Sequence, residues 1–207
     1  VVRSMFTEHR NHEQAIWMAN TGLVRPGRPN IGSWVAYGLG AETRDLPAYV
    51  ALPDPVGLPV DGIRNWSNGW LPPIFQGTAF RSQGAPVLHL NPATPRNQTL
   101  SNGRLGLLQT LNRKHLARRA GELELEARIA NFELAARMQL SATDALDLST
   151  ETQATHQMYG LDNPATRSYG TRCLMARRLV ERGVRFVQLF MKGQPWDTHS
   201  GNTKGLE

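Results

Sequence analysis

The chain has 207 residues, of which 40% are hydrophobic and 19% are charged. This composition is typical of a folded globular protein and excludes a disordered one. The net charge is +6, and no apolar run reaches the roughly 18 residues of a membrane span. The single cysteine, Cys173, excludes an internal disulfide and a metal cage of cysteines alone, and we expect it to be a small core residue.

Arginine supplies most of the basic charge, with 20 Arg against 3 Lys. A nucleic-acid-binding protein would gather this charge on one face. Here the arginines are spread from Arg3 to Arg185, and the one dense run, residues 113–119, is followed at once by Glu122, Glu124 and Glu126. We therefore expect no nucleic acid partner, and nucleic acid binding is only a third, weaker alternative that the net charge suggests.

Two short helices are predicted in the first 45 residues. Residues 12–20 have apolar side chains at helical spacing, and Gly22 follows as a residue that tolerates the left-handed conformation of a helix end. Asn30 is a suitable N-cap for a second helix, residues 31–39. Ahead of both, residues 1–5 are predicted as the end of a strand.

Residues 46–99 differ in character, because nine of the 13 prolines lie between Pro47 and Pro95. The apolar run 48–52 is bounded by prolines and predicts a short buried strand. Residues 53–99 predict a loop-rich excursion, since the prolines exclude a regular helix and the aromatic side chains argue for order. Such a segment is a lid, a binding wall or a purely structural cover.

Residues 100–160 are predicted to be helical. One stripe recurs at spacings that are typical of a helix facing a core, and its members are Leu125, Ile129, Phe132 and Ala136. An earlier stripe predicts another helix, and its members are Leu105, Leu108, Leu111 and His115.

The last segment, residues 161–207, predicts a helix followed by a strand. Asn163 and Pro164 are typical of a helix start, and Gly183 ends the helix. The run 184–191 is mostly apolar and rich in strand-forming residues. A helix, a glycine and an apolar strand make half of a parallel β-α-β unit, so ligand-binding residues are expected just beyond the end of this strand.

Asp197 and His199 lie at that place and are the best local candidates for a metal site. Two residues apart in an extended chain, they can present a carboxylate oxygen and an imidazole nitrogen to the same side. This pair suits a divalent transition metal, although a complete site needs three or more ligands. In the alternative, Asp197 caps a helix and His199 is a surface residue.

His9, Arg10 and His12 form a second cluster. Histidines three apart share a helix face and can both bind a metal. The segment also follows the predicted strand end at residues 1–5, so it can lie on the same edge of the sheet as Asp197. The alternative is a loop and a first helical turn with ordinary polar residues.

Several motifs occur in a specific order along nearly the whole chain. They are Arg3-Ser4-Met5, Asn11-His12 and residues 28–40, 123–129, 159–162, 176–187 and 196–199. Together they resemble a bacterial sulfatase-like family of unknown function within the alkaline phosphatase superfamily.

The resemblance implies an open α/β fold, a twin-arginine export signal ahead of the first strand, and further strands after the Asp-x-His segment. Residues 1–207 would then be an internal part of a single domain that is truncated at both ends, exported to the periplasm or beyond, with its nucleophile outside this chain. Asp197 and His199 match the metal-ligand segment, although their spacing departs from the Asp-x-x-x-His of alkaline phosphatases. His12, and with it Arg10, is implied to lie near the catalytic centre.

The predicted fold class is therefore α/β, with a partial, open, mostly parallel sheet flanked by helices and a loop-rich excursion. The predicted function is metal-assisted hydrolysis of a sulfate or phosphate ester by the full-length protein, with a divalent metal ion as cofactor and an inactive fragment here. The alternative from another class is a non-catalytic exported protein that keeps the fold for binding or assembly. No transmembrane segment is expected, and the oligomeric state is not predicted.

Overall fold

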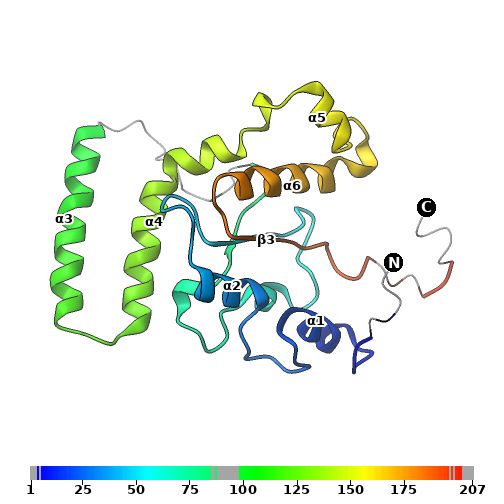
Figure 1. Cartoon of the computed structure of the whole chain (residues 1–207), viewed down its shortest axis with the longest axis horizontal. Coiled ribbons are helices and arrows are strands. Elements are labelled where there is room, and N and C mark those ends of the chain that lie inside the picture. Colours follow the sequence, from blue (N-terminus) through cyan, green and yellow to red (C-terminus); the bar gives the residue numbers. More distant parts are fainter. Residues whose placement is uncertain are drawn as a thin grey trace.

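The computed structural model describes residues 4, 6–84, 87, 98–195, 197 and 199–201. It confirms the α/β class, because three parallel strands form an open sheet with helices on both sides (Figure 1). The strands are β1 (Tyr49–Leu52), β2 (Thr78–Ala79) and β3 (Phe186–Leu189). The helices of the described residues are α1 (His12–Thr21), α2 (Ile31–Leu39), α3 (Gln98–Ala117), α4 (Leu123–Leu146), α5 (Gln153–Met158) and α6 (Pro164–Glu181), with the 3-10 helices η1 (Gly62–Trp66), η2 (Pro73–Phe75) and η3 (Leu148–Thr150).

The central strand of the sheet is β1, and the strand order is β2-β1-β3. Val50 lies opposite Thr78 on one side and opposite Val187 on the other. The predicted parallel pairing of the last strand is thereby confirmed. All three strands run in the same direction, so their carboxyl ends meet at one edge.

Alternate residues of β1 point to opposite faces of the sheet, as the pleat requires, and different helices cover the two faces. Val50 and Leu52 belong to a core cluster with side chains of α4 and α6, namely Met138, Ala142, Ala145, Met175 and Leu179. Tyr49 and Ala51 belong to a second cluster with Ala36 of α2, Trp66 and Phe190. No residue of β1 is more than 2% exposed, which makes this strand the centre of the core.

Helix ends follow the local signals in the sequence. The Asn30 side chain accepts a hydrogen bond from the Gly32 N–H at 2.7 Å, and α2 has the predicted bounds. Asn163 caps α6 in the same way. Gly22 ends α1 with a φ of 72°, a left-handed conformation that favours glycine.

The predicted core-facing stripe of α4 is only partly buried, and Phe132 is 49% exposed. The buried side of α4 instead carries Ala127 and Met138, each 3% exposed. At 3.6 residues per turn, the predicted stripe lies on the opposite side of the helix. The reason is that α4 runs between α3 and the rest of the molecule, so one of its faces meets only α3 (Figure 1).

The loop-rich excursion is partly described, over residues 53–84 and at Val87. It contains η1, η2 and the short β2, and its Trp66 and Phe80 are buried at 3% and 0% exposure. Residues 85–86 and 88–97 of the predicted excursion lie outside the described residues. Its last two residues, 98 and 99, belong to α3, so the loop-rich prediction is wrong there. The predicted strand end at residues 1–5 also lies outside the described residues, apart from Ser4, which is in a turn.

No helix among the described residues combines the length and the apolar character needed to cross a membrane.

Candidate functional site

The chain segments that leave β1 and β3 stay together at the carboxyl edge of the sheet. Pro59 and Gly193 form an isolated parallel bridge, and the Gly193 N–H donates to the Leu58 carbonyl at 3.2 Å. The segment after β3 therefore runs beside the loop after β1. In open α/β sheets, ligands bind at this edge.

His12 is the first residue of α1, and this end of the helix lies at the same edge, where His12 contacts Asp197. The other end of α1 is tied to the sheet by Asn20. The Asn20 side chain donates to Asn65 Oδ1 at 2.9 Å and accepts from Gln188 Nε2, on β3, at 2.8 Å. These buried polar contacts fix the direction of α1 and, with it, the position of His12.

His12 and His199 both contact the carboxylate of Asp197. His12 Nε2 lies 2.7 Å from Asp197 Oδ2, and His199 Nδ1 lies 2.5 Å from Asp197 Oδ1. The His199 N–H also donates to Asp197 Oδ1, at 3.3 Å. The structure thus brings three of the predicted site residues together into one group, which we call the His12–Asp197–His199 cluster.

The two histidines favour the ionised form of Asp197. Desolvation of the carboxyl would raise the pKa of Asp197, but the hydrogen bond from His12 and the charge and N–H of His199 outweigh it and lower that pKa below its ordinary value. Asp197 is therefore a carboxylate near neutral pH, the form that accepts hydrogen bonds or binds a cation.

The donor types of the cluster suit a divalent transition metal, since imidazole nitrogen and carboxylate oxygen are common ligands of such ions. Their present arrangement is one of hydrogen bonds, because each carboxylate oxygen contacts one imidazole. Within the described part of the chain, no group of three or more His, Cys, Asp or Glu is arranged to hold a metal ion. Binding by Asp197 and His199 would require the His199 imidazole to turn out of its present contact with the carboxylate, and His199, whose side chain is 82% exposed, has room to do so.

A pocket of about 640 Å³ lies beside the cluster, and His12 and Asp197 form part of its wall. The rest of the wall is mostly apolar and comes from α1, the loop after β1, α6 and the end of β3. It consists of Ala15, Ile16, Pro59, Val60, Tyr169, Leu189, Phe190, Met191, Gly193, Gln194 and Pro195. The volume is within the range of small-molecule sites.

The other predicted site residues stay apart from the cluster. His9 Nδ1 accepts a hydrogen bond from the Asn11 N–H at 3.2 Å and has no described contact with Asp197. Arg10 is exposed, and no contact among the described residues joins it to Asp197. Its predicted place beside the catalytic centre stays a prediction.

Helix α6 contributes a residue that the sequence analysis did not single out. Arg172 is 1% exposed, pairs with Asp54 and donates to the carbonyl of Phe190, a pocket residue. The sequence carried a signal for it, because Arg172 precedes Met175 and Leu179 by three and seven residues and so shares their core-facing side. Cys173, the predicted core residue, is half-buried, and burial raises the pKa of its thiol.

The comparisons with known proteins correct the predicted family. The family model that matches residues 1–207 describes a protein of unknown function, DUF1501. Nothing in the comparisons points to a sulfatase-like family or to the alkaline phosphatase superfamily, so that prediction is wrong. The prediction rested on short motifs such as Asn11-His12 and residues 196–199, and an α/β fold with such motifs does not by itself fix a superfamily or a function. No curated protein and no solved structure matches the chain. Over its whole length, the chain belongs to the DUF1501 family.

Proposed function

We propose that this protein binds a divalent metal ion at the His12–Asp197–His199 cluster and hydrolyses a sulfate or phosphate ester held in the adjoining pocket. The observation that carries the proposal is the contact of 2.7 Å between His12 and Asp197, residues from opposite ends of the sequence. Membership of DUF1501 supplies no activity, so the proposal depends on the chemistry of this cluster and on its place at the carboxyl edge of a parallel sheet.

Each residue of the cluster has a distinct part in this proposal. Asp197 and His199 would hold the ion. His12 would orient the Asp197 carboxylate through its hydrogen bond and would face the substrate, since it lines the pocket. A bound divalent ion would polarise the ester oxygens and stabilise the negative charge that develops on them.

Metal binding is the first test. The purified 207-residue chain is stripped with a chelator and titrated with Zn²⁺ and Mn²⁺ by calorimetry. Asp197→Asn combined with His199→Gln should abolish binding, because it removes both proposed ligands. The matched control is Asp162→Asn combined with His115→Gln. It changes the same residue types at two exposed positions outside the cluster. This variant should bind the metal as the wild type does. Undiminished binding by the Asp197/His199 variant would refute the ligand assignment.

Ester hydrolysis is the second test. 4-Nitrophenyl phosphate and 4-nitrophenyl sulfate separate the two ester classes, and each is assayed with and without the metal that binds. Turnover that requires the metal and falls in His12→Gln supports the proposed reaction. Because the 207-residue chain alone is expected to be inactive, both assays use the full-length protein. A full-length protein that binds the metal and turns over neither ester removes the hydrolase proposal and leaves the metal site.

A second candidate function is ligand binding without catalysis, in an exported protein. One observation favours it: each carboxylate oxygen of Asp197 already contacts an imidazole, so the hydrogen bonds of this carboxylate are made within the cluster. The mostly apolar pocket wall also suits a ligand that is bound and not converted. Under this candidate, Asp197→Asn lowers the free energy of unfolding and leaves metal content unchanged. Export is tested separately, by locating the protein in cell fractions.

A further inference from the structure

Helices α3 and α4 form a hairpin at one end of the molecule, and α3 contacts little besides α4 (Figure 1). No described side chain of α3 is buried. Its half-buried residues Leu105, Asn112 and Leu116 recur at i, i+7 and i+11, which defines the side that faces α4. The other described residues of this 20-residue helix are exposed.

The open side of α3 is apolar in its middle. Leu107 is 61% exposed, Leu108 40% and Leu111 52%. At 3.6 residues per turn, Leu108, Leu111 and Leu107 lie about 60°, 120° and 160° around the helix from the side that faces α4. Helical hairpins of this kind gain stability by burying such a face against further helices.

Two interior glycines make α3 depend still more on packing. A Cβ at Gly103 or Gly106 would meet nothing within 4 Å, so no close contact with a described residue explains either glycine. Glycine in a helix interior is unfavourable relative to alanine. A long helix with two such glycines and no buried side chain among its described residues gains stability from a packing partner.

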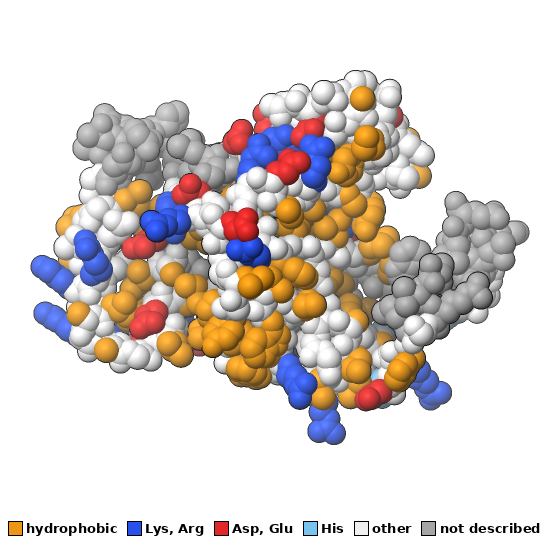
Figure 2. Space-filling model, viewed as in Figure 1, with side chains coloured by type: hydrophobic (Ala, Val, Ile, Leu, Met, Phe, Trp, Pro, Cys, Tyr) orange, Lys and Arg blue, Asp and Glu red, His pale blue; other side chains and the backbone are white. Residues whose placement is uncertain are grey.

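The charges on this hairpin are segregated. Leu107, Leu111, Lys114 and Arg118 follow one another at i, i+4, i+7 and i+11, so the apolar face of α3 continues into a basic one. On α4 the same spacing gives Glu122, Glu126, Ile129 and Glu133, an acidic face around an apolar residue. Figure 2 shows the basic side chains projecting from this end of the molecule. Within the described chain, no salt bridge involves Lys114, Arg118, Glu122 or Glu126.

We propose that two copies of this protein associate through their α3–α4 hairpins, with α3 of each copy lying against α4 of the other in a four-helix bundle. The twofold axis runs parallel to the hairpins. Neighbouring helices are then antiparallel, as in common four-helix bundles, and each leucine face is covered.

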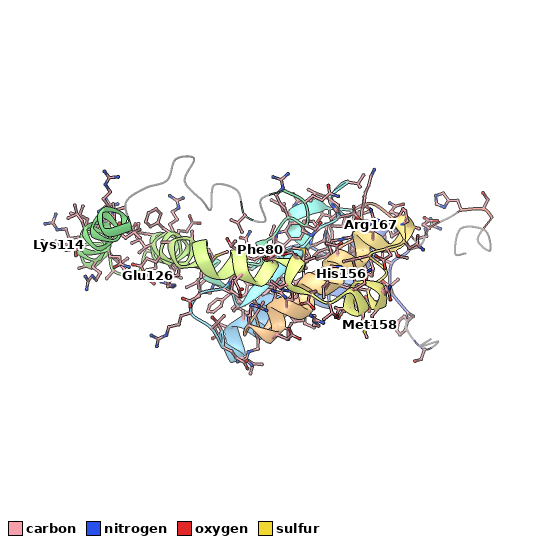
Figure 3. The ribbon with its side chains drawn as sticks, turned by 90° about the horizontal axis from the view of Figure 1, so that it is seen from above. Phe80, Lys114, Glu126, His156, Met158 and Arg167 are labelled. Atoms are coloured by element: carbon pink, nitrogen blue, oxygen red, sulfur yellow. The ribbon has the colours of Figure 1, made fainter. Side chains whose placement is uncertain are left out.

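Charge and shape agree in this arrangement. Both helices have the same rise per residue, so residues equally far from the turn between them lie at the same height. Lys114 then meets Glu126 of the other copy, and Leu111 meets Ile129. Lys114 and Glu126 both lie at the hairpin end of the molecule (Figure 3).

The oligomeric state of the whole chain tests the proposal. Sedimentation equilibrium over a range of protein concentrations should give twice the chain mass of 23.0 kDa. Leu107→Lys combined with Leu111→Lys should weaken the dimer by tenfold or more, because it places charge in the apolar contact. The control is Met158→Lys on α5, a substitution at an 82% exposed apolar residue, which should leave the dimer unchanged.

Exchanging the charges of Lys114 and Glu126 tests whether the partner is a second copy in which these two residues meet. Lys114→Glu alone and Glu126→Lys alone should each weaken the dimer, and the two together should restore it, because the attraction returns with its signs exchanged. Circular dichroism shows whether each variant keeps its helices. A wild-type chain that is a monomer at every concentration, or a dimer that the leucine variant leaves intact, overturns the proposal.

Discussion

The guanidinium of Arg172 is buried against the carboxylate of Asp54, with Arg172 Nη2 2.8 Å from Asp54 Oδ2. Arg172 is on α6, and Asp54 follows β1, so the pair joins a helix to the carboxyl edge of the sheet. Arg172 is 1% exposed and Asp54 15%. A buried charge that loses its partner pays a large desolvation cost.

Asp54→Asn is therefore expected to destabilise the protein by about 3 kcal/mol, because it leaves the buried guanidinium without an anion. Urea denaturation measures the change in the free energy of unfolding. The matched control is Glu124→Gln, which breaks a salt bridge whose partners are 79% and 80% exposed. It should cost less than about 0.5 kcal/mol. Equal losses in the two variants would show that Asp54 contributes no more than a surface acid.

A methyl group at Gly32 is expected to destabilise the protein. A Cβ there would lie 2.6 Å from the ring of Tyr49 and 2.7 Å from that of Phe186, so α2 would have to move away from the sheet. Gly32→Ala should cost about 1–3 kcal/mol. In the same helix, Gly38→Ala meets nothing within 4 Å and should stabilise the protein by up to about 1 kcal/mol. Thermal unfolding of the two variants should give shifts of opposite sign.

Tyr49 should make the protein less stable in alkali. Burial raises the pKa of the Tyr49 hydroxyl well above its ordinary value of 10.0. As pH rises through about 10, the unfolded chain loses this proton while the folded protein keeps it, so the free energy of unfolding falls.

Tyr49→Phe is expected to flatten that alkaline decline. At neutral pH the variant is less stable than the wild type, because Gln188 loses the hydrogen bond that the hydroxyl donates at 2.7 Å. Urea denaturation at a series of pH values separates the two effects. Tyr37→Phe, at a ring that is 55% exposed, is the control and should follow the wild type. A parallel decline in the wild type and Tyr49→Phe contradicts the prediction.

Glu151 is expected to contribute to stability above acidic pH. Hydrogen bonds from Arg177 and Arg178 lower the pKa of Glu151 below its ordinary value of 4.5. The stabilisation is therefore present above that value and is lost as pH falls through the lower pKa of the folded protein. Melting temperatures from pH 7 downward should fall less steeply in Glu151→Gln than in the wild type. Glu8→Gln, at an exposed residue, should show no such difference.

Much of the fold follows from local signals in the sequence. Asn30 and Gly40 mark the two ends of α2 because the side-chain cap and the glycine act on the nearest turn of helix. The parallel strand after α6 is likewise predictable from the cap at Asn163 and the apolar run behind Gly183. β3 is shorter than the predicted run because only residues 186–189 pair with β1.

Features set by tertiary packing were harder to predict. The stripe around Phe132 has helical spacing, but spacing does not say whether the protein core or a second helix covers it. The burial of Arg172 depends on Asp54, which is far away in sequence. For these residues the deciding contact lies outside any local window.

The candidate site was predicted in part. Asp197 and His199 follow from their place after an apolar strand, and His12 from the expectation that its segment reaches the same edge. No sequence pattern points to Asn20 and Gln188, whose hydrogen-bonded side chains hold α1 in its direction toward that edge. An Asn in a helix and a Gln in a strand do not predict a buried hydrogen bond, because both residue types are mostly found at the protein surface.

The pairing of β1 with β3 has a consequence for synthesis of the chain. Tyr49 is made 137 residues before its neighbour Phe186. The central strand must therefore wait for this further length of chain before its second edge is covered, and pairings this distant in sequence form slowly. Until then β1 presents an apolar strand edge to other nascent chains. We expect recovery of folded protein to depend strongly on chaperones that shield such edges.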